Sequence, residues 1–305
     1  MKDKYIIGID LGGTNLKIAL FSSGLRFKDR ENLPTGNYLS QDSLISAITG
    51  AVRQITAKNK LNNKDILGVG LGLPGPIDVK KGLVHFFPNI PGWIDVPLRD
   101  ILKKRIGLPV FIDNDANLMC LAEYKLGAAR GAQNAVCLTL GTGVGAGLII
   151  EGKLFRGSSF AAGEIGHMPI NEKGPACNCG GTACLEAYVG NRRIAAQARK
   201  IFKKDIPLEE LSRMARANNR KAAGIWEDAA FRIGLALVSV VNLLNPDRIV
   251  IGGGVSSAGK VLFSRIEETI ISRAMVVQAG KVKVFKAELG NNAGMLGAAL
   301  LVREG

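Results

Sequence analysis

The sequence contains no apolar run of the roughly 20 residues that a membrane-spanning helix needs. Its first residues, 1–5, mix charged and polar side chains and lead directly into a short strand-like segment, so no targeting signal is visible. We therefore expect a soluble, cytoplasmic protein without a membrane partner.

A long basic run is also missing, although 40 Lys and Arg residues against 26 Asp and Glu residues give a net charge of +14. The basic residues occur in scattered pairs such as Lys80-Lys81 and Lys103-Lys104, without interleaved aromatic residues. Nucleic-acid-binding proteins concentrate such charge on one face or along one helix. We expect a solvated basic surface and no nucleic-acid partner.

The five cysteines do not form the even, spread-out framework of a small secreted protein, because three of them lie between Cys177 and Cys184. His167 precedes this group by ten positions. One histidine and three cysteines complete a tetrahedral zinc set, and four protein ligands leave no position for a catalytic water. The spacing predicts a structural Zn²⁺ held by His167, Cys177, Cys179 and Cys184, and it disfavours three buried free thiols.

The chain has 305 residues, of which 47% are hydrophobic, and this length suits two domains of about 150 residues each. Short apolar runs alternate with amphipathic segments, which is typical of an α/β fold. No linker rich in Pro or Ser marks the boundary. We expect a small domain over residues 1–118, joined by a terminal helix over 293–305, and a larger domain with the zinc site over 119–292.

Glycines gather in loops between strand-like runs. Residues 5–10 and 16–21 flank one glycine pair, and residues 135–140 and 148–150 flank a second glycine-rich loop, so each pair of runs predicts a β-hairpin. A third run, Gly252-Gly253-Gly254, follows a predicted strand. Glycine lets backbone N–H groups approach a phosphate closely, although tight hairpins also use it.

Three such loops favour a nucleotide site. Residues 141–146 fit a dinucleotide fingerprint formally, but a strand follows where that fingerprint opens a helix. Residues 147–153 imitate a P-loop, yet Leu154 stands where Ser or Thr must bind magnesium. Asp10 is a candidate for holding Mg²⁺ with ATP through water. The predicted nucleotide-binding residues, which the family resemblance given below assigns to ATP, are Asp10, Gly12, Gly13, Thr14, Asn15, Lys17, Thr139, Gly141, Thr142, Gly143, Gly253 and Gly254.

Two carboxylates and two amides lie at a predicted strand-to-helix junction, Asp113-Asn114-Asp115-Ala116-Asn117. A sugar kinase needs a carboxylate beside the acceptor hydroxyl and an amide that orients the sugar. The alternative is an N-cap, because Asp and Asn start helices by accepting from free N–H groups. The residues alone do not decide between a catalytic carboxylate and a helix N-cap.

The segments 10–15, 140–143 and 113–117, together with the cysteine group, resemble the ROK family (repressors, open reading frames, sugar kinases). The likeness runs essentially from end to end. It implies an α/β fold of two ribonuclease H-like, actin/hexokinase-type domains around a central cleft. Ala183 stands where the family usually has Gly, and alanine strains a backbone position of positive φ.

The resemblance assigns roles to individual residues. It places the general base at Asp115 and makes Asp113 structural. The residues that it places on the sugar are Gly75, Asn89, Asn114, Asp115, Glu164, His167 and Glu186. His167 would then serve zinc with one ring nitrogen and the sugar with the other.

We expect an ATP-dependent hexose kinase that transfers the γ-phosphate to the 6-hydroxyl of glucose. Fructose, mannose, allose and N-acetylhexosamines remain as alternative substrates. Sugar-responsive regulators of the same family form a second alternative. They carry an added N-terminal helix-turn-helix domain, for which the first strand at Tyr5 leaves no room, and this sequence retains Asp115. The family also implies a homodimer or homotetramer.

Overall fold

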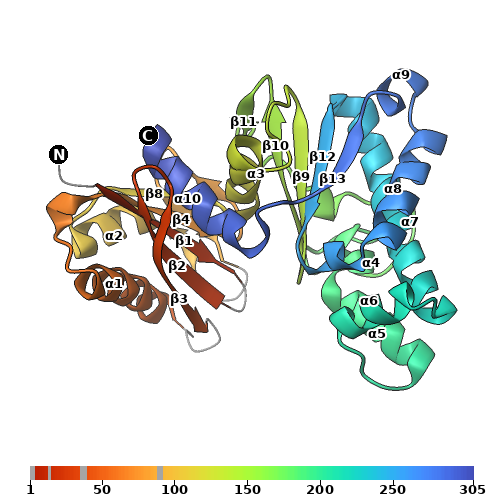
Figure 1. Ribbon diagram of the computed structural model, residues 1–305, viewed down its shortest axis with the longest axis horizontal. Coiled ribbons are helices and arrows are strands. Elements are labelled where there is room, and N and C mark those ends of the chain that lie inside the picture. Colours follow the sequence, from red (N-terminus) through yellow and green to blue (C-terminus); the bar gives the residue numbers. More distant parts are fainter. Residues whose placement is uncertain (1–3, 13–14, 35–39, 88–91) are drawn as a thin grey trace. The chain divides into compact units, whose positions relative to one another are not determined.

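The computed structural model describes residues 4–12, 15–34, 40–87 and 92–305. Contacts between residues divide the chain into two compact units (Figure 1). Unit 1 comprises Met1–Ala122, Arg156–Ala162 and Asn291–Gly305, and unit 2 comprises Glu123–Phe155 and Gly163–Gly290. The boundary that we expect near residue 118 stays a prediction.

Each unit is built on a five-stranded sheet in which the central strand pairs antiparallel on one side and parallel on the other. The order in unit 1 is β3-β2-β1-β4-β8, and the order in unit 2 is β11-β10-β9-β12-β13. Both expected hairpins are present, since β1 pairs with β2 and β9 pairs with β10. The same strand arrangement thus occurs twice along the chain, as the α/β expectation requires.

The strands of unit 1 are β1 (Tyr5–Leu11), β2 (Asn15–Ser22), β3 (Phe27–Pro34), β4 (Ile66–Leu73) and β8 (Val110–Asn114), and a small separate sheet holds β5 (Ile77–Asp78), β6 (Leu83–Phe86) and β7 (Ile94–Val96). Its helices are α1 (Gln41–Lys58), α2 (Leu98–Ile106) and α10 (Ala293–Glu304). Ser40 caps α1, because its side chain accepts from the N–H of Ser43.

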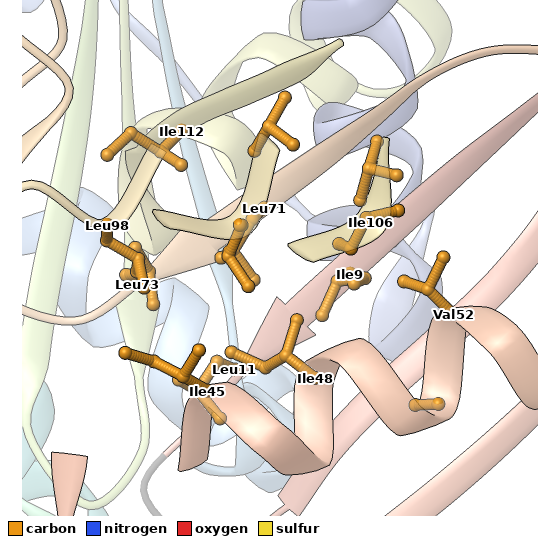
Figure 2. Packing of buried hydrophobic residues seen from close by; sticks show 14 of the residues in the cluster. Ile9, Leu11, Ile45, Ile48, Val52, Leu71, Leu73, Leu98, Ile106 and Ile112 are labelled. Carbon is orange, nitrogen blue, oxygen red and sulfur yellow. The ribbon is translucent and has the colours of Figure 1, made fainter. Parts of the chain in front are cut away.

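One face of the unit 1 sheet packs its branched side chains against α1 and α2. Ile9, Leu71 and Ile112 from three neighbouring strands meet Ile48 of α1 and Ile106 of α2 in this core (Figure 2). All of these side chains are at most 9% exposed. Alternation along each strand then presents the intervening residues to the opposite face.

On that opposite face, glycines in β1 and β4 carry no side chain, so α10 packs directly against the backbone of these strands. A Cβ at Gly70 would stand 1.9 Å from the carbonyl oxygen of Ala298, and a Cβ at Gly8 would stand 2.2 Å from that of Met295. Neither position tolerates a side chain. The C-terminal helix is therefore a structural part of unit 1.

The strands of unit 2 are β9 (Ala135–Leu140), β10 (Val144–Ile150), β11 (Lys153–Phe155), β12 (Arg248–Gly252) and β13 (Lys283–Lys286). Its helices are α4 (Glu186–Val189), α5 (Asn191–Phe202), α6 (Leu208–Arg216), α7 (Arg220–Leu244), α8 (Lys260–Arg273) and α9 (Val276–Ala279). Helix α3 (Asp115–Leu126) begins in unit 1 and ends in unit 2. Among the described residues, no helix combines the length and the apolar character needed to cross a bilayer.

Candidate active site and metal centre

Asn114 joins the end of β8 to the start of α3. Its Oδ1 accepts from the backbone N–H groups of Ala116 (2.9 Å) and Asn117 (3.2 Å), so it caps the helix, as the structural reading of this junction requires. Its Nδ2 donates to the carbonyl oxygen of Gly75 (3.1 Å). The structure thus brings two predicted sugar-site residues, Asn114 and Gly75, into direct contact, and the second Nδ2 hydrogen of the amide can serve a hydroxyl.

The two carboxylates of the junction have different surroundings. Asp113 is 1% exposed and forms an ion pair with Arg156, with Oδ2 2.6 Å from Nη2. Asp115 is the first residue of α3 and is only partly buried, and its Oδ1 accepts from the N–H of Ala116 at 2.8 Å. Both oxygens of Asp113 are already engaged, Oδ2 by Arg156 and Oδ1 by Asn114 and Asn117, so Asp115 is the better candidate to contact a sugar hydroxyl as a base.

Glu164 and His167 lie together at a short 3₁₀ helix, Ile165–His167. The Glu164 carboxylate is half exposed, and its Oε2 lies 3.8 Å from Nε2 of His167. The loop is held close to β10, since a Cβ at Gly166 would stand 2.1 Å from the carbonyl oxygen of Val144. This packing fixes the place of both polar side chains within unit 2.

Glu186, the third acidic candidate, is tied to the second glycine loop. Its Oε2 accepts from the backbone N–H of Val144 at 2.8 Å, and a Cβ at Gly143 would stand 2.5 Å from the same oxygen. The carboxylate therefore links the predicted sugar and nucleotide residues of unit 2. Asn89, also predicted on the sugar, falls outside the described residues.

The four predicted zinc ligands converge. Their donor atoms all lie within 4.8 Å of one another, with 3.7 Å between Sγ of Cys177 and Nδ1 of His167 and 3.7 Å between the Sγ atoms of Cys179 and Cys184. A tetrahedral Zn²⁺ with Zn–S bonds of about 2.3 Å and a Zn–N bond of about 2.0 Å places a sulfur and a nitrogen ligand about 3.5 Å apart and two sulfur ligands about 3.8 Å apart. The residues present fit a closed zinc site.

The chemistry of the thiols also favours a cation. The N–H of Gly181 lowers the pKa of Cys179, whereas burial, followed by the neighbouring thiols, raises the pKa of Cys184. Three thiolates at contact distance repel one another unless a metal neutralises them. The coordinating nitrogen would be Nδ1 of His167, because Nε2 faces Glu164.

Ala183 has a backbone φ of +57°. This conformation favours glycine, the residue that the family usually has at this position. The left-handed region costs a residue with a Cβ about 1–2 kcal/mol. The residue is fully buried beside Cys184, a predicted metal ligand, and its carbonyl accepts from the N–H of Ile170 at 2.9 Å. The segment between Cys179 and Cys184 therefore holds a strained alanine in place.

In unit 1 the first glycine loop carries an acidic and a basic group. Asp10 lies opposite Lys17 in the β1–β2 register, with Oδ2 3.4 Å from Nζ. Burial raises the pKa of Asp10, and the Lys17 ammonium opposes that shift. The N–H of Gly12 donates to the carbonyl oxygen of Asn15 at 2.9 Å, whereas Gly13 and Thr14 lie outside the described residues.

In unit 2 the other two glycine loops meet. Gly253 has a φ of +81°, and a Cβ there would stand 2.2 Å from the carbonyl oxygen of Leu140, directly before Gly141. The N–H of Gly141 donates to the carbonyl oxygen of Gly143 at 2.9 Å, which closes the turn. The predicted residues Thr139, Gly141, Thr142, Gly143, Gly253 and Gly254 thus form one cluster at the ends of β9 and β12.

Sequence reasoning missed Asn191 at the start of α5. Its N–H donates to the carbonyl oxygen of Gly141 (2.9 Å), and its Nδ2 lies 4.0 Å from the Cβ position of Gly254. Its Oδ1 is buried and has no hydrogen-bond partner among the residues that the structure describes. No motif marks this asparagine, because only the fold brings it to the glycine cluster.

A family model described as "ROK family" matches residues 6–305. The chain belongs to the ROK family. Over its whole length this ROK protein is 35% identical to a glucokinase of Halalkalibacterium halodurans, and the match covers 96% of that protein. It is 31% identical to a xylose repressor of Caldicellulosiruptor bescii, covering 97% of this chain and 77% of the repressor.

A solved ROK family glucokinase from Streptomyces griseus, in complex with glucose and AMPPNP, is 31% identical to this ROK protein. The two structures match with a TM-score of 0.86, over 99% of this chain and 100% of that one. This likeness confirms the expected actin/hexokinase-type fold class.

Proposed function

We propose that this ROK protein is an ATP-dependent glucokinase that transfers the γ-phosphate of ATP to the 6-hydroxyl of glucose. Similarity to glucokinases along the full length of both chains supports the proposal. The observation that carries the chemistry is the junction at the end of β8. There Asp113 forms an ion pair with Arg156, and Asn114 donates to the carbonyl oxygen of Gly75. Asp115, the next residue, is the first of α3.

In this mechanism the Asp115 carboxylate accepts the proton of the 6-hydroxyl while the oxygen attacks the γ-phosphorus. A bond forms between that oxygen and phosphorus, the bond to the β-phosphate oxygen breaks, and ADP leaves. Asn114, Gly75, Glu164, His167 and Glu186, with Asn89, are the proposed hydroxyl partners. Positioning supplies most of the rate, because a phosphoryl transfer needs little covalent chemistry from the protein.

The glycine cluster of unit 2 and the β1–β2 loop of unit 1 are the proposed partners of ATP. Asp10 would hold Mg²⁺ through water, and this ion neutralises charge on the phosphates when ATP is bound. Zn²⁺ at His167, Cys177, Cys179 and Cys184 would be structural, since four protein ligands close the site. We also expect a cytoplasmic homodimer or homotetramer, which sedimentation analysis would test.

A coupled ADP-release assay over a panel of hexoses tests the function. We expect glucose to give the highest kcat/KM, with mannose and glucosamine weaker, because a pocket that bonds each hydroxyl leaves polar groups unpaired when one is inverted or replaced. If fructose or N-acetylmannosamine exceeds glucose tenfold, the glucose assignment is wrong and the kinase assignment stands. If no hexose releases ADP, the kinase assignment fails.

The likeness to a xylose repressor favours one alternative, a sugar-responsive regulator. Basic charge alone gives only weak and salt-sensitive DNA affinity. Specific DNA binding at physiological salt, together with an inactive kinase assay, would establish this alternative.

A further inference from the structure

A short segment, Arg156–Ala162, belongs to unit 1 although the chain on either side of it belongs to unit 2. The N–H of Ala162 donates to the carbonyl oxygen of Arg156 at 3.0 Å, so the segment closes into a loop. Its strongest polar contact is made by Arg156, whose Nε and Nη2 lie 2.8 Å and 2.6 Å from the same oxygen, Oδ2 of Asp113.

The other oxygen of Asp113 holds the residues on both sides of the proposed base. Oδ1 accepts from the backbone N–H of Asn114 at 2.8 Å and from Nδ2 of Asn117 at 3.1 Å. Asn114 precedes Asp115, and Asn117 lies in the first turn of α3. The orientation of the Asp113 carboxylate therefore sets the start of the helix that presents Asp115.

We propose that Arg156 is a positioning residue for phosphoryl transfer, which through Asp113 fixes the Asn114–Asp115 dipeptide at the start of α3. The inference rests on the proposed function, in which Asp115 is the base. A carboxylate that is 1% exposed needs a charged partner, because removing one member of a buried pair leaves an uncompensated charge. Arg156 supplies that charge from a side chain that is itself only 25% exposed.

The geometry requires arginine rather than any cation. Two N–H groups of the guanidinium converge on Oδ2 and leave Oδ1 to Asn114 and Asn117, whereas a lysine ammonium acts as a single point of charge. Gly163 and Glu164 follow the loop directly in the chain. Arg156 thus lies on the segment that precedes Glu164, a proposed sugar-binding residue. It also forms an ion pair with Asp113 at the end of β8, next to the proposed base.

The test substitution is Arg156→Lys, which keeps the charge and removes the planar contact. The matched control is Arg105→Lys, because Arg105 also forms a 2.6 Å ion pair, with Asp42, but on an exposed surface of unit 1. The measurements are the thermal midpoint, the hexose dissociation constant, the KM for ATP and the single-turnover rate of phosphoryl transfer. Misplacement by about 1 Å can cost about 10²-fold in rate.

We expect Arg156→Lys to remain folded, with the single-turnover rate reduced on the order of tenfold to a hundredfold and the KM for ATP within twofold of the wild type. Arg105→Lys should match the wild type throughout. A folded Arg156→Lys variant with a normal rate overturns the proposal, since a merely structural ion pair would change only the thermal midpoint. If the lysine variant does not fold, the double variant Arg156→Met/Asp113→Asn removes both charges and is judged by the same rate criterion.

A double-mutant cycle with Asp115→Asn shows whether Arg156 acts through the base. We expect the combined variant to be no slower than Asp115→Asn alone, because the group being positioned is already lost. Additive losses would overturn the positioning role while leaving Asp115 as the base. A near-normal rate for Asp115→Asn would instead overturn the base assignment in the proposed function, whatever Arg156→Lys does.

Discussion

Replacement of Cys179 by Ser removes one ligand from the proposed zinc centre and leaves the surrounding chain intact. Cys179 is exposed, so the substitution creates no cavity in the core. The apparent binding free energy of a structural Zn²⁺ is about 10–16 kcal/mol for four ligands, or roughly 2.5–4 kcal/mol for each. We expect Cys179→Ser to lower the stability of unit 2 by that amount and to weaken hexose binding, because His167 belongs to both proposed sites.

The assay combines elemental analysis with thermal unfolding. Wild-type protein should carry one zinc per chain, and Cys179→Ser should carry much less and melt several degrees lower. Cys120→Ala is the control for metal content, because it also removes a thiol but from a helix outside the cysteine and histidine cluster. Fully active wild-type protein without bound zinc would refute the reasoning, as would a Cys179→Ser variant with unchanged metal content and unchanged melting.

Three further changes test the remaining site residues. Asp115→Asn should lower kcat by about 10²–10⁴ while calorimetry finds glucose bound within a few-fold of wild type, and a near-normal kcat would contradict the base assignment. Gly253→Ala should weaken ATP binding sharply, because its Cβ would stand 2.2 Å from the carbonyl oxygen of Leu140; unchanged KM for ATP would exclude this loop from the site. Burial raises the pKa of Asp10, so its charged form opposes folding at neutral pH and this cost disappears as the pH falls through the raised pKa. Asp10→Asn should therefore raise the thermal midpoint at pH 7 by a few degrees and abolish activity, and a lower midpoint would contradict the sign.

The local elements were predictable because their signals are local. Apolar runs around glycine predict both hairpins, and the structure contains them. Residue spacing alone also indicated the metal cluster. A left-handed backbone at Ala183 followed from the resemblance, because the family places a glycine there.

The contacts that depend on long-range folding were not predictable. Nothing in the residues around Arg156 indicates that it pairs with Asp113, which lies 43 positions earlier in the chain. Asn191 likewise meets Gly141 only because α5 begins beside the second glycine loop. Loop closure over such separations is determined by the whole fold, and a single sequence carries no local signal for it.

The packing of α10 on β1 and β4 makes the completion of unit 1 depend on residues that follow all of unit 2 in the chain. Gly8 and Gly70 leave a strip of backbone against which the α10 residues Met295 and Ala298 pack. Because a chain leaves the ribosome from its N-terminus, this strip stays open to solvent, and to chaperones, while all of unit 2 is synthesised. A Cβ at Gly294 would stand 2.5 Å from Cγ of Asp10, so α10 also borders the loop proposed to bind phosphate. Deletion of residues 293–305 would therefore be expected to impair the proposed nucleotide site at Asp10 as well as the packing of unit 1.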